Sequence, residues 1–293
     1  AHIDSTSQNP YTYAPGADDN ASGSAGLMEI ADILSRYKFG CTLRYLLFTG
    51  EEQGYYGSMA YADDASKSGE NIEAVLNLDM IGYNTLESSP TLELHTRWEN
   101  ESDLAIANLF VEAVDTYQID LIPNILQDGK AFSDHASFWQ YGYPAILAIE
   151  DWEDHTPFYH STSDQLETLN MAYMTEFAKA ATATFAHMGC LLQGELSGII
   201  TDASTGTPIS GAYIKAKSEN GMLWSTNTKP DGSFHMTLIP DSYRLFIAAP
   251  NFRSETLEGI QVINEKTTTQ DYALQPNILD YSVYLSNIKK NAP

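Results

Sequence analysis

Cysteine and long apolar runs are scarce in this sequence of 293 residues. Its two cysteines, Cys41 and Cys190, allow one disulfide or two buried apolar thiols and define no disulfide scaffold. The absence of a C-x-x-C pair excludes a zinc site built on cysteine. No stretch approaches the ~20 consecutive apolar residues of a membrane-spanning helix, and no basic segment leads into an apolar one at the start. We therefore expect a soluble chain in which any export signal is absent or already removed.

Basic residues are also few. The chain has 15 of them against 39 acidic residues, which gives a formal net charge of −24 and a pI near 4.4. Phosphate backbones and anionic membranes repel such a chain, so neither nucleic acid nor a membrane is an expected partner. Most of the carboxylates are expected on the solvated surface. The pattern leaves open whether a few of them converge on a metal ion.

Residues 1–191 alternate between helix-like and strand-like patterns. Apolar residues recur at helical spacing after the small-residue run 21–26, and LRYLLF at 43–48 is typical of a buried strand. Further strands are predicted at 74–78, 91–96 and 144–149, with 91–96 half exposed, and further helices at 56–65, 104–117 and 171–188. This alternation predicts an α/β domain with a mostly parallel or mixed sheet between helices. Functional residues in such folds gather at the carboxyl ends of the strands.

The pattern changes near Leu192. From there to about Pro276, short strand-like runs are separated by turn signals such as Asn220-Gly221 and Asp231-Gly232, at a spacing of about ten residues. Without a helical period, this spacing predicts a second, smaller all-β sandwich over 192–276. Residues 277–293 form a tail that is too short to fold alone.

Histidines and carboxylates cluster at the predicted strand ends and helix starts of the first domain. Singly, each has an ordinary explanation: Asp19 or Asn20 could cap the first helix, and adjacent glutamates are usually loop acids. Asp79 is harder to explain in this way, because a carboxylate at the end of a buried strand costs free energy unless it is paired or metal-bound. The set comprises His2, Asp4, Asp18, Asp19, Glu51, Glu52, Asp79, His160 and Asp164.

These residue types together favour a catalytic metal centre. Histidine and carboxylate ligands without thiolates suit Zn²⁺, with Mn²⁺ or Co²⁺ as substitutes. Two imidazoles and three carboxylates are too many for one open tetrahedral zinc, but they fit two ions about 3.5–4 Å apart that share a bridging carboxylate. Because neighbouring side chains on a turn diverge, one of Glu51 and Glu52 can bind metal while the other acts as general base.

Five short motifs follow one another along residues 1 to about 190. They are His2-Ile-Asp4-Ser, Pro15-Gly-Ala-Asp18-Asp19-Asn-Ala-Ser-Gly23, Gly50-Glu51-Glu52, Asn77-Leu-Asp79 and Tyr159-His160-Ser-Thr-Ser-Asp164. In this order they resemble the motifs of the secreted bacterial leucine-type aminopeptidases with co-catalytic zinc. The resemblance implies that Asp19 bridges two Zn²⁺ ions, that His2 and Asp79 complete one ligand set, and that Glu52 and His160 complete the other.

The resemblance also implies roles for residues that do not bind metal. Glu51 would be the general base, Tyr159 would donate to the developing oxyanion, and Asp4 would fix the tautomer of the His2 imidazole. The family pattern favours Asp19 over Asp18 for the bridge and His160 over His155 as ligand. Ser133–Phe138 is expected to line the pocket, whereas His95, His187 and His235 have no evident carboxylate partner and are expected to be structural or surface residues.

The second domain resembles the transthyretin-like, carboxypeptidase regulatory-like sandwich. The likeness rests on Gly198-Ile-Ile-Thr-Asp202, Thr228-Lys-Pro-Asp231-Gly232 and Tyr243-Arg-Leu, and none of these residues has ligand or nucleophile spacing. In the aminopeptidase family a strand precedes the residue that corresponds to His2. We therefore expect the first domain, 1–191, to lack its leading strand.

The sequence thus predicts a secreted di-zinc aminopeptidase. We expect a monomer that acts on peptides with a free N-terminus. Two alternatives remain at this point. One is a glutaminyl cyclase-like or carboxypeptidase-like enzyme of the same fold. The other is a non-catalytic peptide-binding or surface-binding protein with a disabled metal site.

Overall fold

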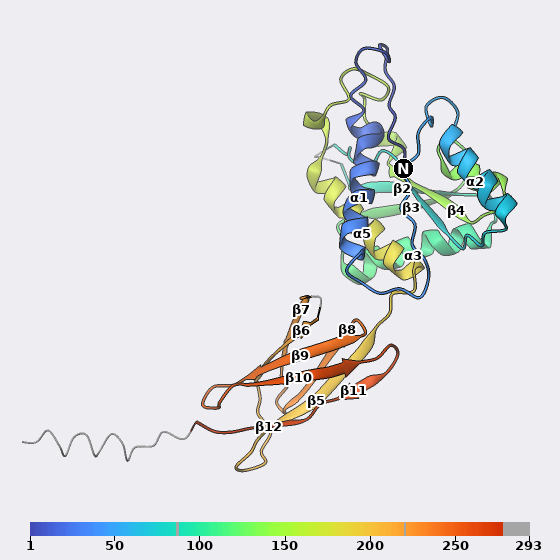
Figure 1. The fold of residues 1–293 in the computed structure, drawn as a ribbon. Helices are drawn as coiled ribbons and strands as arrows, with labels where there is room; N and C mark the ends of the chain where they lie inside the picture. The colour runs from blue at the N-terminus through green and yellow to red at the C-terminus, as the bar shows by residue number, and fades with distance from the viewer. Residues whose placement is uncertain (86–87, 220, 278–293) are drawn as a thin grey trace, which may run out of the picture. The chain divides into compact units, whose positions relative to one another are not determined.

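The chain forms two compact units, of which the first is Ala1–Leu191 and the second begins at Leu192 (Figure 1). This computed structural model describes residues 1–85, 88–219 and 221–277. The predicted tail therefore lies outside the described residues, apart from Asn277. Among the described residues, no helix has both the length and the apolar character needed to cross a membrane.

The first unit is built on a mixed four-stranded sheet. Its strands are β1 (Val75–Leu78), β2 (Thr91–Thr96), β3 (Ile122–Gln127) and β4 (Ala145–Glu150), in the order β1-β4-β2-β3. β1 is parallel to β4 and β2 is parallel to β3, whereas β2 and β4 are antiparallel. All six residues of β4 are buried, as expected for a strand with neighbours on both sides and helices on both faces. The predicted α/β class is confirmed.

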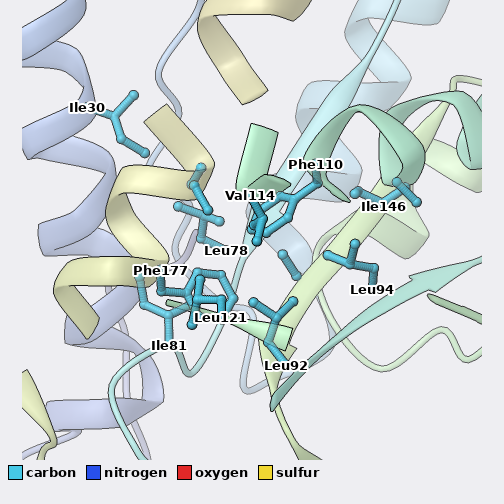
Figure 2. Close-up of a cluster of buried hydrophobic side chains, with 14 of the residues drawn as sticks. Ile30, Leu78, Ile81, Leu92, Leu94, Phe110, Val114, Leu121, Ile146 and Phe177 are labelled. Atoms are coloured by element: carbon cyan, nitrogen blue, oxygen red, sulfur yellow. The ribbon is translucent and has the colours of Figure 1, made fainter. Parts of the chain in front are cut away.

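Helices cover both faces of this sheet. Helices α1 (Gly23–Leu34), α3 (Glu101–Tyr117) and α5 (Met171–Met188) contribute to one core, part of which Figure 2 shows around Phe110 and Phe177. Helices α2 (Tyr56–Ser68) and α4 (His135–Gln140) supply Ala62 and Phe138 to a smaller cluster with Ala145 of β4. Successive residues of β4 therefore serve opposite cores: Ile146 points to the first, and Ala145 to the second.

The prediction of a strand at 43–48 is wrong. This segment forms no ladder, and only Phe48 pairs with another segment, through a parallel bridge to His2. A groove of about 480 Å³ separates the segment from β1, which lies at the edge of the sheet. An extended segment becomes a strand only where a neighbour satisfies its N–H and C=O groups, and among the described residues no strand lies within reach.

Other boundaries differ for local reasons. The predicted helix at 104–117 begins at Glu101 because the Asn100 side chain caps it by accepting from Asp103 N. The 91–96 strand is buried rather than half exposed, since β3 and β4 flank it and α3 packs on it. Strand β3 and helix α4 were not predicted. Three short turns complete this unit: η1 (Ala17–Ser22), η2 (Trp152–Asp154) and η3 (Leu166–Thr168).

The second unit is all β, as predicted. One sheet has the order β10-β9-β6-β7, and in the other β5 pairs with β8, β11 and β12. Alternate residues of the long strands point inward, and Leu196, Ile214 and Leu245 are among those fully buried in its core. The strands are β5 (Gly194–Asp202), β6 (Tyr213–Ser218), β7 (Leu223–Asn227), β8 (Ser233–Leu238), β9 (Asp241–Ala248), β10 (Glu255–Val262), β11 (Thr267–Thr269) and β12 (Tyr272–Leu274).

Candidate metal centre

The five predicted metal ligands come together in the first unit. Asp79 follows β1 directly, Asp19 lies in η1 just before α1, and His160 lies in the loop that follows β4. His2 and the Glu51-Glu52 turn are joined through the Phe48 bridge, in which Ile3 N donates to Phe48 O at 2.9 Å. With Glu51, the predicted general base, these residues form two groups whose ligand atoms lie within 4.8 Å of one another: His2 with Glu51 and Asp79, and Asp19 with Glu52 and His160.

Asp19 connects the two groups. Its Oδ1 lies 3.3 Å from His2 Nε2, while its Oδ2 lies 3.1 Å from His160 Nε2. A second carboxylate lies near each of these nitrogens: Asp79 Oδ1 is 3.3 Å from His2 Nε2, and Glu52 Oε2 is 3.0 Å from His160 Nε2. One carboxylate thus faces two imidazoles with two different oxygens, which is the arrangement that a bridging ligand requires.

The electrostatics show how strongly this centre favours positive charge. Burial lowers the pKa of His2, but the carboxylates of Asp19 and Asp79 outweigh burial and raise it to about 12. Hydrogen bonds to Asp19 and Glu52 raise the pKa of His160 to about 10. The pKa of Asp19 itself is lowered, because the two histidines outweigh its burial. Without metal, protons on the two histidines offset part of the negative charge of these carboxylates, and a metal ion that binds the two nitrogens would displace them.

The adjacent glutamates differ in environment, as the sequence predicted. Glu52 pairs with His160, and its other oxygen, Oε1, is buried without a hydrogen-bond partner among the described residues. Glu51 Oε2 lies 4.0 Å from His2 Nε2. Burial, followed by the charge of Asp79, raises the pKa of Glu51 to about 8. A carboxyl group with such a pKa can exchange a proton near neutral pH.

Asp4 does not act as predicted. The acceptor for His2 Nδ1 is the backbone oxygen of Asp4, at 3.0 Å, whereas the Asp4 carboxylate is 3.7 Å away. That carboxylate instead accepts from the backbone N–H groups of Glu51 and Glu52, both at 3.3 Å. Asp4 therefore contacts His2 Nδ1 through its main chain and holds the Glu51-Glu52 turn through its side chain.

The competing residues lie outside both ligand groups. Asp18 is fully buried, and its Oδ1 accepts from Gly82 N at 2.9 Å. His155 stacks on Trp152 at a ring distance of 4.5 Å. The sequence left open whether Asp19 or Asn20 caps the first helix. Asn20 does so, because its Oδ1 accepts from Gly23 N at the start of α1. Asp19 is left to face the two histidines.

Asp164, the last residue of the His160 motif, holds the Asp19 loop in place. Its two carboxylate oxygens accept from Asp18 N at 2.9 Å and from Asp19 N at 3.1 Å. This contact joins segments about 145 positions apart in the chain. The motif therefore carries one predicted ligand, His160, and one residue, Asp164, that positions the Asp19 loop.

Ser133 was expected only to line the pocket, but it contacts a predicted ligand. Its hydroxyl donates to Asp79 Oδ2 at 2.5 Å and accepts from Asn77 Nδ2 at 2.8 Å. Ser133 is fully buried. The arrangement leaves Asp79 Oδ1 directed at His2 and fixes the rotamer of this carboxylate.

Replacing Ser133 by alanine is expected to weaken zinc binding about 10- to 100-fold, because the Asp79 carboxylate loses the hydrogen bond that orients it. Zinc affinity measured by competition with a chelating dye checks this result. Ser163→Ala is the matched control, since Ser163 is exposed in the His160 loop. An affinity equal to that of the control would show that Ser133 does not orient Asp79.

The prediction that His95 and His235 lack carboxylate partners is wrong. His95 is fully buried between Glu93 Oε2, at 2.9 Å from Nε2, and Asp128, at 3.1 Å from Nδ1. His235 Nε2 lies 2.6 Å from Glu195 Oε2 in the second unit. Asp128 lies in the loop after β3, so only the tertiary fold brings it to His95.

His135 at the start of α4 makes the first unit sensitive to acid. It is fully buried, and its Nδ1 has no hydrogen-bond partner among the described residues. Burial lowers the pKa of His135 to about 4 in the folded chain, whereas the pKa in the unfolded chain is about 6.5. As the pH falls below 6.5, the imidazole of the unfolded chain is therefore protonated before that of the folded chain. The stability that neutral His135 contributes is therefore present above pH 6.5 and is lost toward pH 4.

We expect His135 to account for a loss of about 2 kcal/mol in the free energy of unfolding between pH 7 and pH 5. Urea unfolding of the wild type and of His135→Gln at both pH values measures this loss. The free energy of unfolding of the variant is expected to be lower than that of the wild type at pH 7, but to decrease less between pH 7 and pH 5. An equal change in both proteins would contradict the assignment.

A cavity of about 340 Å³ opens onto the metal centre. Asp19, Glu51, Asp79 and His160 form its polar side, and the remaining lining residues are Met80, Lys130, Phe132, Ile149, Trp152 and Tyr159. None of the residues Ser133–Phe138, which were expected to line the pocket, lines this cavity, although the neighbouring Phe132 does. Tyr159 is 41% exposed, and its ring stacks on His160 at a ring distance of 3.7 Å. The centre is therefore open to a ligand that carries an apolar group.

A comparison with family models decides where this chain belongs. Residues 1–185 match peptidase family M28. The chain belongs to peptidase family M28. Residues 195–275 match the carboxypeptidase regulatory-like domain. Both matches confirm the resemblances that the motifs indicated.

Individual relatives cover the same M28 region. The chain is 35% identical over 187 residues to a probable leucine aminopeptidase of Arthroderma otae, which covers 61% of this chain and 50% of that protein. Among solved structures, the LapA aminopeptidase of Legionella pneumophila is 30% identical, with a TM-score of 0.51 over 59% of this chain and 47% of the other. BSAP, a zinc aminopeptidase from Bacillus subtilis, is 26% identical, with a TM-score of 0.54 over 64% and 45%. The chain spans about half the length of the curated relatives it matches.

Proposed function

We propose that the first unit is a zinc-dependent aminopeptidase centre that holds two Zn²⁺ ions. Asp19 would bridge the ions, with His2 and Asp79 completing one ligand set and Glu52 and His160 the other. The observation that carries this proposal is the placement of the two Asp19 oxygens, one at 3.3 Å from His2 Nε2 and one at 3.1 Å from His160 Nε2. The relatives named as leucine and zinc aminopeptidases support the same function.

The residues present fit two zinc ions. Two imidazole nitrogens and three carboxylates are ligands that zinc accepts. The ligand atoms of Asp19, Glu52 and His160 lie within 4.8 Å of one another, and Asp19 Oδ1 and Asp79 Oδ1 each lie 3.3 Å from His2 Nε2. Glu52 Oε1 is buried with no partner among the described residues, which is costly for a carboxylate unless a cation lies beside it. The backbone oxygen of Asp4 holds His2 Nδ1, so that Nε2 presents a lone pair to the centre.

The side chains divide the work of peptide hydrolysis. Zinc, when bound, polarises the scissile carbonyl and lowers the pKa of the attacking water. The Glu51 carboxylate takes a proton from that water and returns it to the leaving amine. The Tyr159 hydroxyl donates a hydrogen bond to the oxyanion that develops on the carbonyl oxygen.

The charge of the centre favours substrates with a free N-terminus. Glu51 and Asp79 lie at the polar side of the cavity and can attract the ammonium group of a peptide. Met80, Phe132 and Trp152 supply an apolar surface for the first side chain. An internal peptide bond brings no ammonium group to these carboxylates, which favours an exopeptidase over an endopeptidase.

Hydrolysis of leucine p-nitroanilide, compared with its N-acetylated form, tests the proposal. We expect the blocked substrate to be cleaved at least about 100-fold more slowly, because it loses a charge-assisted contact worth a few kcal/mol. Equal cleavage of both substrates would end the aminopeptidase assignment. Elemental analysis of the same sample is expected to find two zinc ions per chain, whereas one tightly bound ion would favour cyclase chemistry.

A further inference from the structure

The two cysteines of this chain lie side by side, although 149 positions separate them. The Sγ atoms of Cys41 and Cys190 are 3.7 Å apart, with the Cys41 S–H directed at the Cys190 sulfur. Both residues are exposed. The alternative of two buried thiols, which the sequence left open, is therefore wrong, and both sulfurs can be reached by a dissolved oxidant.

The backbone holds the two cysteines in this position. Gly40 N donates to Cys190 O at 3.0 Å, and Cys41 N donates to Gly189 O at 3.2 Å. An antiparallel bridge between Phe39 and Leu191 extends the pairing on the other side. This register places Cys190 opposite Gly40 and Cys41 opposite Gly189, so the two cysteines are diagonal neighbours on adjacent segments. Their sulfurs, 3.7 Å apart, have to approach to the bonding distance of about 2.05 Å, which rotation about the Cα–Cβ bonds can supply.

We propose that Cys41 and Cys190 are a disulfide site, oxidised by a small-molecule disulfide such as oxidised glutathione. The thiolate of one cysteine attacks the oxidant and forms a mixed disulfide, with release of one reduced thiol. The second cysteine then displaces the other half. The two cysteine S–H bonds and the S–S bond of the oxidant break, one protein S–S bond forms, and the two protons and two electrons of the cysteines reduce the oxidant to two thiols.

The bond would close a ring around most of the first unit. The ring contains Glu51, Asp79 and His160, together with helices α2 to α5. It would also pin the start of the 41–48 segment to the residues that follow α5. This segment leads into the Glu51-Glu52 turn and has no strand beside it among the described residues, so it depends on its ends for placement. A covalent link at Cys41 would stabilise it by limiting the unfolded chain.

Thiol counting and mass spectrometry on the full chain test the site. After incubation with oxidised glutathione, we expect no free thiol in denaturant and a mass lower by two hydrogen atoms. Peptic digestion without reductant is expected to yield one bonded peptide pair that contains both cysteines. Hydrogen bonding to Cys190 raises the pKa of Cys41, so the reaction is expected to be faster at alkaline pH.

Thermal unfolding adds a second readout. Because the ring encloses about 150 residues, the oxidised chain is expected to melt about 10 °C above the same chain reduced with a phosphine. The double variant C41S/C190S is the control and is expected to melt at one temperature under both conditions. Two titratable thiols after oxidation, a mass increase by two glutathione molecules, or a wild-type melting shift no larger than the control's would overturn the proposal. None of these measurements depends on peptidase activity.

Discussion

Replacing Glu51 by glutamine is expected to lower kcat for leucine p-nitroanilide about 10³-fold, within the 10²–10⁴ range of general-base removal. Glutamine has the shape of glutamate but cannot take a proton from water. The raised pKa of Glu51, about 8, matches a group that accepts and returns a proton near neutral pH. Asp19, the proposed bridge, and both histidines are unchanged, so the zinc content of the variant is expected to equal that of the wild type.

Steady-state kinetics and elemental analysis on the same preparation separate loss of the base from loss of metal. Glu153→Gln is a suitable control, because Glu153 is exposed in η2 near Trp152 of the cavity. We expect this control to change kcat less than about twofold, since a solvated surface acid contributes little to the centre. Full activity in Glu51→Gln would remove Glu51 from the mechanism. Lost zinc would instead make Glu51 a ligand.

The residues that gather at the candidate site could be picked out from the sequence because each is tied to a local feature. Asp79 follows a strand, Asp19 precedes a helix, and Glu52 lies in a tight turn, so each appears as a short motif at fixed offsets. The rule that strand ends meet at one edge of a sheet indicated that such motifs gather. In the structure the rule applies to Asp79, whereas the Phe48 bridge positions His2 and the Asp164 carboxylate positions Asp19.

The supporting contacts could not be predicted in this way. Ser133 reaches Asp79 across 54 positions, and the Asp4 carboxylate reaches the N–H of Glu51 across 47. Both contacts depend on the side-chain rotamer and on which atom of each residue faces its partner. The order of residues in the sequence specifies neither of these. The same limit applies to His95, whose partner Asp128 approaches only after β3 has paired with β2.

The segment 43–48 shows a different limit. Its apolar run LRYLLF is typical of a buried strand. A segment is a β-strand, however, only where its backbone hydrogen-bonds to a neighbouring segment. Phe48 finds one partner in His2, which is sufficient to fix the turn that carries Glu51 and Glu52. The apolar pattern of residues 43–48 therefore indicated where the Glu51-Glu52 turn lies, but it did not predict that this segment forms no ladder of backbone hydrogen bonds.

Replacing Asp19 by asparagine is expected to have the largest effect on the centre. Asparagine keeps one oxygen but puts an amide NH₂ where the second oxygen faced a histidine, and NH₂ is not a metal ligand. One oxygen cannot face both His2 and His160 as the two carboxylate oxygens do. The substitution also removes a buried negative charge between the two histidines, which weakens their hold on any cation.

We therefore expect Asp19→Asn to retain at most one zinc ion per chain and to lose more than about 10³-fold in kcat/KM, since a metal ion supplies several kcal/mol to the transition state. Elemental analysis after gel filtration, together with kinetics at saturating zinc, measures both quantities. Glu29→Gln, on the exposed face of α1 nearby, is the control and is expected to retain both ions. Two retained ions and activity within tenfold of the control would show that Asp19 is not the bridge, and the two ligand groups would then have to act independently.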